Sequence, residues 1–265
     1  MTGAARMPFG ARLRLLRNKR YEDWWHIVFG GPLGVFIAAL VADVRWITPN
    51  LVTVVGFIMR LAGAAMIVIR EPWADLTAMG LLELSLVLDI TDGSLARYRK
   101  QPSALGAFLD KITDGISLAT LGFFLGYRAW LEGHGAFHLL AGAFLGCAYL
   151  LRCYMYWVVA YLERDYAAPP TVGPASVLAF GELSFGARLR YYLGSSWRIV
   201  LVGEGDIYFW VGLGLILGRP EDVVVPLAGA MALWTLIVAT KRLTTVRQID
   251  RHAAAAKAAR QEPGS

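Results

Sequence analysis

Long apolar segments separated by short polar turns dominate this chain. A membrane-spanning helix needs about 20 largely apolar residues. Runs that reach or approach this length lie at residues 51–69, 73–88, 105–127, 137–162, 206–217 with its flanks, and 223–239. Helix breakers separate them at Glu71-Pro72, in the turn 132–135 and at Arg219-Pro220. The pattern predicts an all-α, polytopic membrane protein whose core is a six-transmembrane-helix bundle.

The composition agrees with this prediction. Of the 265 residues, 57% are hydrophobic and 17% are charged. Ordinary soluble domains carry about 25% charged residues, so a soluble globular domain is excluded. The net charge of +6 would also suit nucleic-acid binding. The basic residues, however, gather at the ends of the apolar segments, so we expect membrane lipids and no nucleic acid as partners. Cys147 and Cys153 have neither zinc-site nor disulfide spacing.

The distribution of basic residues predicts the orientation. With six spans, both termini and the loops after the second and fourth spans lie on one side of the membrane. That side holds most of the lysines and arginines, whereas the opposite turns hold only Arg70, Arg128 and Arg219. The positive-inside rule therefore places both termini in the cytosol of a cell inner or plasma membrane.

Residues 24–41 allow three interpretations: a seventh span, the apolar core of a signal peptide, or an amphipathic helix in the interface. A seventh span would export the Arg-rich amino terminus, and cleavage would leave the next span wrongly oriented. We also expect Gly30-Gly31-Pro32 to break a spanning helix. We therefore predict an interfacial helix within a basic cytosolic arm (1–46), a six-helix catalytic domain (47–243) with a cytosolic loop (about 163–203), and a cytosolic tail (244–265).

Two pairs of aspartates flank the turn between the second and third spans. Asp89 and Asp92 are three residues apart, and Asp110 and Asp114 are four apart, so each pair shares one helix face. The connector 98–104 contains a proline and basic residues, which predicts a short cytosolic turn joining two antiparallel helices. The two pairs should then face each other just inside the cytosolic boundary.

Four carboxylates so close together repel one another and are costly near lipid. We expect them to stay ionised only with two divalent cations among them, and oxygen ligands favour Mg²⁺ or Mn²⁺. Two such ions suit a displacement at phosphorus. Gly93 and Ala96 would let a flat group approach the helix, and Arg97 would bind a phosphate. These features describe a pocket for a nucleoside diphosphate ester.

The pattern D-x2-D-G-x2-A-R-x8-G-x3-D-x3-D resembles the signature of the CDP-alcohol phosphotransferase family. It is met in full by Asp89, Asp92, Gly93, Ala96, Arg97, Gly106, Asp110 and Asp114. Residues 47–53 also look like the opening of the family's first core helix. The resemblance covers residues 47–239, and it covers the amino-terminal arm and the loop after the fourth span less well.

The resemblance implies an enzyme that displaces CMP from a CDP-linked alcohol by attack of a second alcohol on the β-phosphorus. It implies that Asp89, Asp92 and Asp110 are metal ligands and that Asp114 is a further ligand and the general base. By the same resemblance, residues that would bind the CDP donor are Asn50, Thr53, Gly93, Ala96, Arg97 and Gly106. The expected donor is CDP-diacylglycerol and the expected acceptor a small polar alcohol of the inositol, inositol phosphate, glycerol phosphate or serine type. A homodimer is usual among similar proteins.

Other functions remain open at this point. The partners could be reversed, with a CDP-linked head group transferred to a lipid alcohol such as diacylglycerol. The acids could instead line an ion or proton pathway, or form the aspartate-rich motifs of an intramembrane prenyltransferase. They could also only cap two solvated helix ends. An inositol acceptor is less favoured because Gly115 follows the last acid, where inositol enzymes often have a basic residue.

Further polar residues have a functional and a structural interpretation. An anionic acceptor could bind to Lys111, Arg152, Arg188, Arg190 and Arg198, which otherwise reflect the positive-inside rule or, for Arg152, a buried structural role. Arg60 could pair with a neighbouring helix or line the cleft. Asn50 and Thr53 could equally mark a helix entry, and Glu204 and Asp206 could border the cleft or serve the start of a helix. The spacing of His26, His134 and His138 does not predict a metal site.

Overall fold

The structure is a computed structural model that describes residues 7–16, 24–168, 186–187, 190, 193–194 and 203–261. The described residues form helices joined by turns, and no strand occurs among them. In chain order the helices are α1 (Phe9–Leu16), the π-helix η1 (His26–Gly30), α2 (Gly31–Val41), α3 (Pro49–Met66), the 3₁₀ turn η2 (Ile67–Ile69), α4 (Pro72–Tyr98), α5 (Ala104–Leu131), α6 (Ala136–Asp165), α8 (Glu204–Ile216) and α9 (Glu221–Gln261). The predicted all-α class is confirmed.

The six predicted apolar segments all lie in helices, but only some of these helices have the length and composition of a span. Within the described residues, the helical segments long and apolar enough to cross a membrane are Pro49–Ile69, Ala136–Asp165 and Glu221–Ala254. α4 carries four acids along its length, and α8 has 13 residues, which at 1.5 Å per residue give about 20 Å. Each of the six predicted apolar segments thus corresponds to one of the longer described helices, whereas the prediction that all six span the membrane stays a prediction.

The helices extend further than their apolar segments. α4 continues ten residues past the end of its apolar segment at 88, as far as the predicted connector, and α5 continues four residues past 127. α9 runs without a break from Glu221 to Gln261, so the predicted tail from residue 244 begins inside a helix. Polar residues continue these helices because a helix, once formed, propagates through good helix formers without an apolar face.

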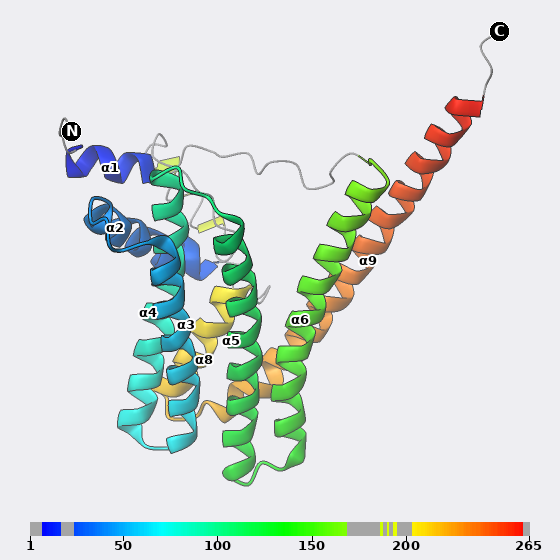
Figure 1. Ribbon diagram of the computed structural model, residues 1–265. Helices are drawn as coiled ribbons and strands as arrows, with labels where there is room; N and C mark the ends of the chain where they lie inside the picture. The colour runs from blue at the N-terminus through cyan, green and yellow to red at the C-terminus, as the bar shows by residue number, and fades with distance from the viewer. Residues whose placement is uncertain are drawn as a thin grey trace.

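The longer helices form a bundle in which α3 packs on α4 and α5, α5 packs on α6, and α6 packs on α9, while α8 lies against α4 and α9. Figure 1 shows α3, α4 and α5 side by side, and α6 and α9 as a pair that leans away from them toward the end at which α1 lies. The buried core is mainly aliphatic and includes Leu82, Leu86, Leu121, Leu145 and Val211. α4 and α5 both pack on α3, and this shared contact fixes their positions relative to each other.

α5 and α6 approach closely because glycines face each other across their contact. A Cβ atom on Gly122 would lie 2.5 Å from the Gly142 carbonyl oxygen, and one on Gly142 would lie 2.2 Å from the Gly122 oxygen. Gly126 and Gly146 are similarly close to the partner helix. Such four-residue spacing of small residues is a common basis for close helix packing in membranes. The α5–α6 contact is therefore a backbone-to-backbone contact.

The amino-terminal helices lie at one end of the bundle, and α1 crosses it (Figure 1). The segment His26–Val41 is apolar but shorter than a span. The expectation that Gly30-Gly31-Pro32 would break the helix is wrong, because the chain stays helical through a π-turn and Pro32 falls in the first turn of α2. Proline is tolerated there because first-turn N–H groups lack an intrahelical acceptor. The interfacial placement of this segment is not tested by its geometry.

Arg99 holds the turn between α2 and α3 in place. Its guanidinium donates hydrogen bonds to the carbonyl oxygens of Val41 (3.2 Å), Ala42 (3.2 Å), Val44 (2.8 Å) and Ile47 (2.7 Å). The first two are at the carboxyl end of α2, where unpaired carbonyls attract a cation. The start of α3 is thereby fixed beside the carboxyl end of α4.

Candidate active site

The four aspartates of the motif lie where α4 ends and α5 begins. Asp89 and Asp92 are on α4, and Asp110 and Asp114 are on α5. A five-residue connector, 99–103, joins the two helices, and its Ser103 accepts a hydrogen bond from the Gly106 N–H at 3.0 Å as the α5 N-cap. The predicted turn between two antiparallel helices is confirmed.

Three of the four carboxylates form a compact group. One carboxylate oxygen each of Asp89, Asp110 and Asp114 lies within 4.8 Å of the others. Mg²⁺ binds oxygen ligands at about 2.0–2.1 Å, so ligands of one ion lie within roughly 4 Å of each other. The three carboxylates fit this hard cation after a small movement. Asp92 is buried and accepts a short hydrogen bond from the Thr53 hydroxyl, so it lies outside the group of three.

Two cations of the chain contact the same acids. Arg60, whose side chain is 3% exposed, reaches Asp89 Oδ1 at 2.8 Å and Asp114 Oδ1 at 2.9 Å through its two terminal nitrogens. Lys111 Nζ lies 2.7 Å from Asp110 and 3.4 Å from Asp114. Contrary to the expectation that only divalent cations keep these acids ionised, an arginine and a lysine also compensate their charge.

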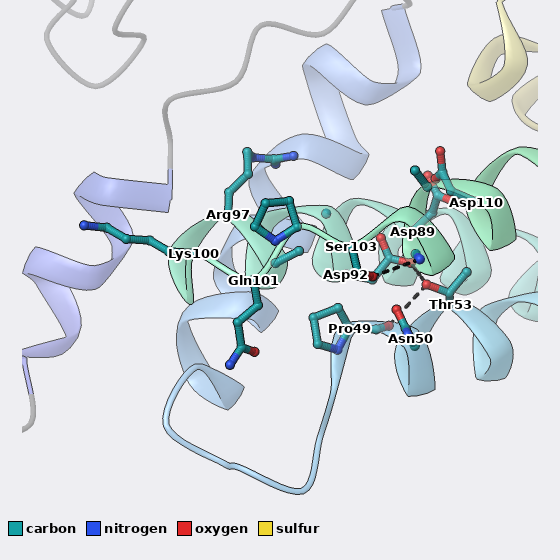
Figure 2. Close-up of a pocket in the computed structure, with 15 residues that line it drawn as sticks. Pro49, Asn50, Thr53, Asp89, Asp92, Arg97, Lys100, Gln101, Ser103 and Asp110 are labelled. Atoms are coloured by element: carbon teal, nitrogen blue, oxygen red, sulfur yellow. Dashed lines mark hydrogen bonds between the residues drawn. The ribbon is translucent and has the colours of Figure 1, made fainter.

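Three of the four acids, Asp89, Asp92 and Asp110, border a cavity of about 670 Å³ between α3, α4 and α5, whereas Asp114 is buried and is not part of its lining. In Figure 2, Asp89, Asp92 and Asp110 gather with Asn50 and Thr53 at one end of this pocket, while Arg97, Lys100 and Gln101 lie at the other. The pocket is lined by Pro49, Asn50, Thr53, Asp89, Asp92, Gly93, Ala96, Arg97, Lys100, Gln101, Pro102, Ser103, Gly106, Ala107 and Asp110. Carboxylates and basic groups thus share one cavity, as binding of a diphosphate together with divalent cations requires.

Every residue expected to bind the donor lines this pocket. Gly93 and Ala96 form part of its α4 wall, and Gly106 forms part of its α5 wall. At Gly106 the helices are close, because a Cβ atom would lie 3.1 Å from Asn50 Oδ1. At Gly93 the nearest atom to a Cβ would be Arg97 Nη1, at 3.2 Å. A side chain at Gly93 would therefore enter the cavity without meeting another helix.

Comparison with known proteins agrees with the site. The sequence profile of the CDP-alcohol phosphatidyltransferase family matches residues 46–189, more than half of the chain. The chain belongs to this family. The match includes all four acids and the residues of the pocket. Membership of this membrane-enzyme family, together with the three long apolar helices, indicates an integral membrane protein.

Individual relatives share part of the chain. It is 38% identical over 92 residues to a CDP-diacylglycerol–glycerol-3-phosphate 3-phosphatidyltransferase of Cereibacter sphaeroides, covering 33% of this chain and 42% of that protein. It is 29% identical over 99 residues to an archaetidylinositol phosphate synthase of Pyrococcus horikoshii, covering 37% and 51%. It is 28% identical over 116 residues to cholinephosphotransferase 1 of Danio rerio, covering 40% and 30%. The chain thus spans about half or less of these relatives.

The candidate acceptor residues are dispersed. Lys111 contacts the acids as described, and Arg152 lies over the Tyr149 ring at 5.4 Å with its Nη1 3.7 Å from the Met231 sulfur on α9. Arg190 is exposed. Arg188 and Arg198 lie outside the described residues. Neither Arg152 nor Arg190 lines the acidic pocket.

A buried polar network behind the acids was only partly anticipated. Of the two alternatives for Arg60, pairing with neighbouring helices is confirmed. Glu204 lies 3.6 Å from Arg60 and accepts a hydrogen bond from the Tyr149 hydroxyl at 2.9 Å, so it borders the site. Asp206 instead serves the start of α8 and accepts hydrogen bonds from the N–H groups of Gly203 and Trp25.

Proposed function

We propose that this protein transfers a phosphatidyl group from CDP-diacylglycerol to the hydroxyl of a small polar alcohol and releases CMP, as a step of phospholipid synthesis. Membership of the family supports the reaction class. The observation that carries the proposal is that three of the motif's carboxylates, the small residues Gly93 and Ala96, and Arg97 line one cavity of about 670 Å³. A cavity of this size suits a nucleotide head group, while the acyl chains of the donor would stay in lipid.

The donor set fits two divalent cations, Mg²⁺ or Mn²⁺, held by Asp89, Asp92, Asp110 and Asp114. When bound, such cations neutralise the diphosphate and the charge that develops on the leaving phosphate. Asp92 would hold such a cation with the oxygen that accepts the Thr53 hydrogen bond. Gly93 and Ala96 would lie against the cytosine and ribose.

The chain's own residues orient the donor and move a proton. Arg97 would bind donor phosphates at the mouth of the pocket. Asp114 would accept the proton of the acceptor hydroxyl while the oxygen of that hydroxyl forms a bond to the β-phosphorus. At the same time the bond between the β-phosphorus and the CMP oxygen breaks, and CMP leaves with the bonding electrons. The Asp114 oxygen that faces Lys111 at 3.4 Å is the more loosely held one and is the better proton acceptor. Arg60 keeps the other oxygen in position.

The orientation in the membrane is part of the same proposal. Six helices, α3–α6, α8 and α9, would span, with the 24–41 segment in the interface and both termini and the pocket in the cytosol. The concentration of basic residues at the pocket end supports this orientation. A homodimer is the expected assembly. Because CDP-alcohols and polar acceptors have water-soluble head groups, the pocket would open to water, on the side that we propose is the cytosol.

The decisive experiment measures CMP release from CDP-diacylglycerol in membranes or detergent with Mg²⁺, offering glycerol 3-phosphate, inositol phosphate, inositol and serine separately. We expect CMP release with one acceptor and none without cation. Asp114→Asn should abolish release while donor binding partly remains, and the exposed Asp165→Asn at the end of α6 should behave like wild type. Full activity of Asp114→Asn would contradict the assigned base.

The same assay separates the alternative functions. A reversed reaction predicts CMP release from CDP-choline or a similar donor with diacylglycerol, and none from CDP-diacylglycerol. An ion pathway through the carboxylates predicts no CMP release with any donor. Either result would refute the proposed phosphatidyl transfer, although only the second would refute CDP-alcohol chemistry.

A further inference from the structure

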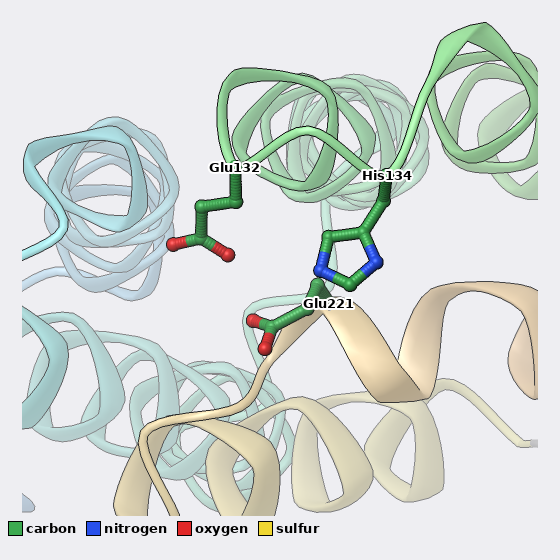
Figure 3. A group of neighbouring side chains, drawn as sticks. All are labelled: Glu132, His134 and Glu221. Carbon is green, nitrogen blue, oxygen red and sulfur yellow. The ribbon is translucent and has the colours of Figure 1, made fainter.

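A second group of candidate metal ligands lies at the opposite end of the bundle. Glu132, His134 and Glu221 each offer one ligand atom, and these atoms lie within 4.8 Å of one another. Figure 3 shows the two carboxylates and the imidazole turned toward a common gap. From Asp110 to Glu132 is 22 residues along α5, or about 33 Å, so this group is separate from the acidic pocket.

Three elements bring these residues together. Glu132 follows the last residue of α5, His134 lies in the α5–α6 turn, and Glu221 opens α9. Gly133 and Gly135 have positive φ angles of 91° and 81°, which lets the turn reverse within four residues. The His134 N–H bonds back to the Ala129 carbonyl at 3.0 Å, so the turn is held against the end of α5. His134 is thereby positioned beside a residue 87 positions away.

The local charges leave a surplus of acid. Arg128 pairs with both oxygens of Asp75, with one contact of 3.1 Å, and its Nε lies 2.9 Å from Glu132 Oε1. Asp75 and Glu132 thus share this one guanidinium, and Glu221 takes part in no ion pair among the described residues. Arg219, close to Glu221 in the chain, pairs with Asp222 at 2.8 Å. Two negative charges remain, which is the charge a divalent cation balances.

Glu221 gives an independent indication of a ligand. The residue is 8% exposed, and its Oε2 atom is buried with no hydrogen-bond donor among the described residues. A buried carboxylate oxygen without a partner is costly, because it has lost its hydration. The exposed His134 and Glu132 lie beside it, so a cation could reach this oxygen from solvent.

We propose that Glu132, His134 and Glu221 form a second cation site that takes a divalent transition metal such as Zn²⁺. The imidazole nitrogen distinguishes this set from the all-oxygen set of the acidic pocket, since imidazole favours zinc over magnesium. The fourth position of a tetrahedral ion would be taken by water. Such an ion would cross-link the α5–α6 turn to the first turn of α9 and stabilise the far end of the bundle.

The test measures zinc on the untagged full-length protein. The protein is equilibrated with 100 µM Zn²⁺ in excess Mg²⁺, which saturates the oxygen-only site, and bound zinc is counted after desalting. We expect one more zinc per chain in wild type than in His134→Ala or Glu221→Gln. The matched control is His138→Ala, whose imidazole lies 5.0 Å from that of His134 but outside the group, and it should keep the zinc.

Thermal unfolding gives a second readout. For zinc at 100 times its Kd, binding raises the Tm by about 5 °C. We expect this rise in Tm in wild type and in His138→Ala, but not in His134→Ala. Because His134 is exposed in the turn, the His134→Ala variant should still fold. Equal zinc content in wild type and His134→Ala, or an equal loss in His138→Ala, would overturn the proposal. The absence of bound zinc in wild type would also overturn the proposal. That result is expected if Glu132 and Glu221 share a proton instead of binding a cation. CMP release enters neither measurement, so these outcomes are independent of the proposed transferase activity.

Discussion

Replacement of Arg60 by methionine tests whether this arginine maintains the acidic site. The guanidinium is almost fully buried and contacts Asp89 at 2.8 Å, Asp114 at 2.9 Å and Glu204 at 3.6 Å. Methionine keeps much of the volume but leaves these carboxylates without their shared cation. Removing one partner of a buried ion pair costs about 3–5 kcal/mol, because the remaining charge stays buried. For a chain of this size we therefore expect the Tm to fall by about 10 °C.

The assay is thermal unfolding of purified Arg60→Met without divalent cations and again with Mg²⁺. Magnesium should recover more of the Tm in the variant than it adds to wild type, because the freed carboxylates have no competing guanidinium. Arg152→Met is the matched control: this half-buried arginine contacts a ring and a sulfur, and its loss should cost about 1 kcal/mol. If Arg60→Met melts within about 2 °C of wild type, or no lower than Arg152→Met, the assigned role of Arg60 is refuted.

Other substitutions test the pocket, the packing and the turn. Gly93→Ala should leave the Tm unchanged or slightly higher, since alanine favours a helix by about 1 kcal/mol relative to glycine. The added methyl group should raise the KM for the CDP donor about tenfold by filling part of the cavity. An unchanged KM would place the donor elsewhere. Gly142→Ala would put a Cβ 2.2 Å from a backbone oxygen of α5 and should lower the Tm by at least about 5 °C. Gly229→Ala, with open space around the new Cβ, should not lower the Tm. Equal Tm values for the two variants would contradict the close α5–α6 contact. Arg99→Lys cannot reach four carbonyls and should expose the 41–47 turn to limited proteolysis; unchanged protection would show that the turn holds without the guanidinium.

Most of the secondary structure could be predicted because membrane helices have a strong local signal. The apolar segments and the breakers between them gave the six longer helices, and the connector 98–104 was correct to within a residue. α4 and α9 extend past their apolar segments because polar helix-forming residues continue a helix, so the predicted tail from residue 244 begins inside α9. A helix at 24–41 was predicted, but its continuity through Gly30 and Pro32 was not, because local rules treat proline as a breaker whereas Pro32 here falls in the first turn of α2.

The acidic site could be predicted because its residues follow one another in the chain. Asp89, Asp92, Asp110 and Asp114 are ordered by helix periodicity and one short turn, so spacing alone brings them together. Arg60 and Glu204 could not be assigned in the same way, because their contacts with the acids depend on how three helices pack. The glycines of α5 and α6 do have a recognisable four-residue spacing, which would have predicted their close contact. His134 was dismissed because its partner Glu221 is distant in the sequence.

The unbroken course of α9 makes it a rigid arm. At 1.5 Å per residue its 41 residues carry Gln261 about 60 Å from Glu221, well past the other helices (Figure 1). A small folded marker joined to this helix in continuous register would stand clear of the catalytic pocket and turn with the bundle. The carboxyl-terminal helix therefore offers a natural mounting point for a fiducial in imaging, or for a spectroscopic label that reports how the molecule tilts in its bilayer.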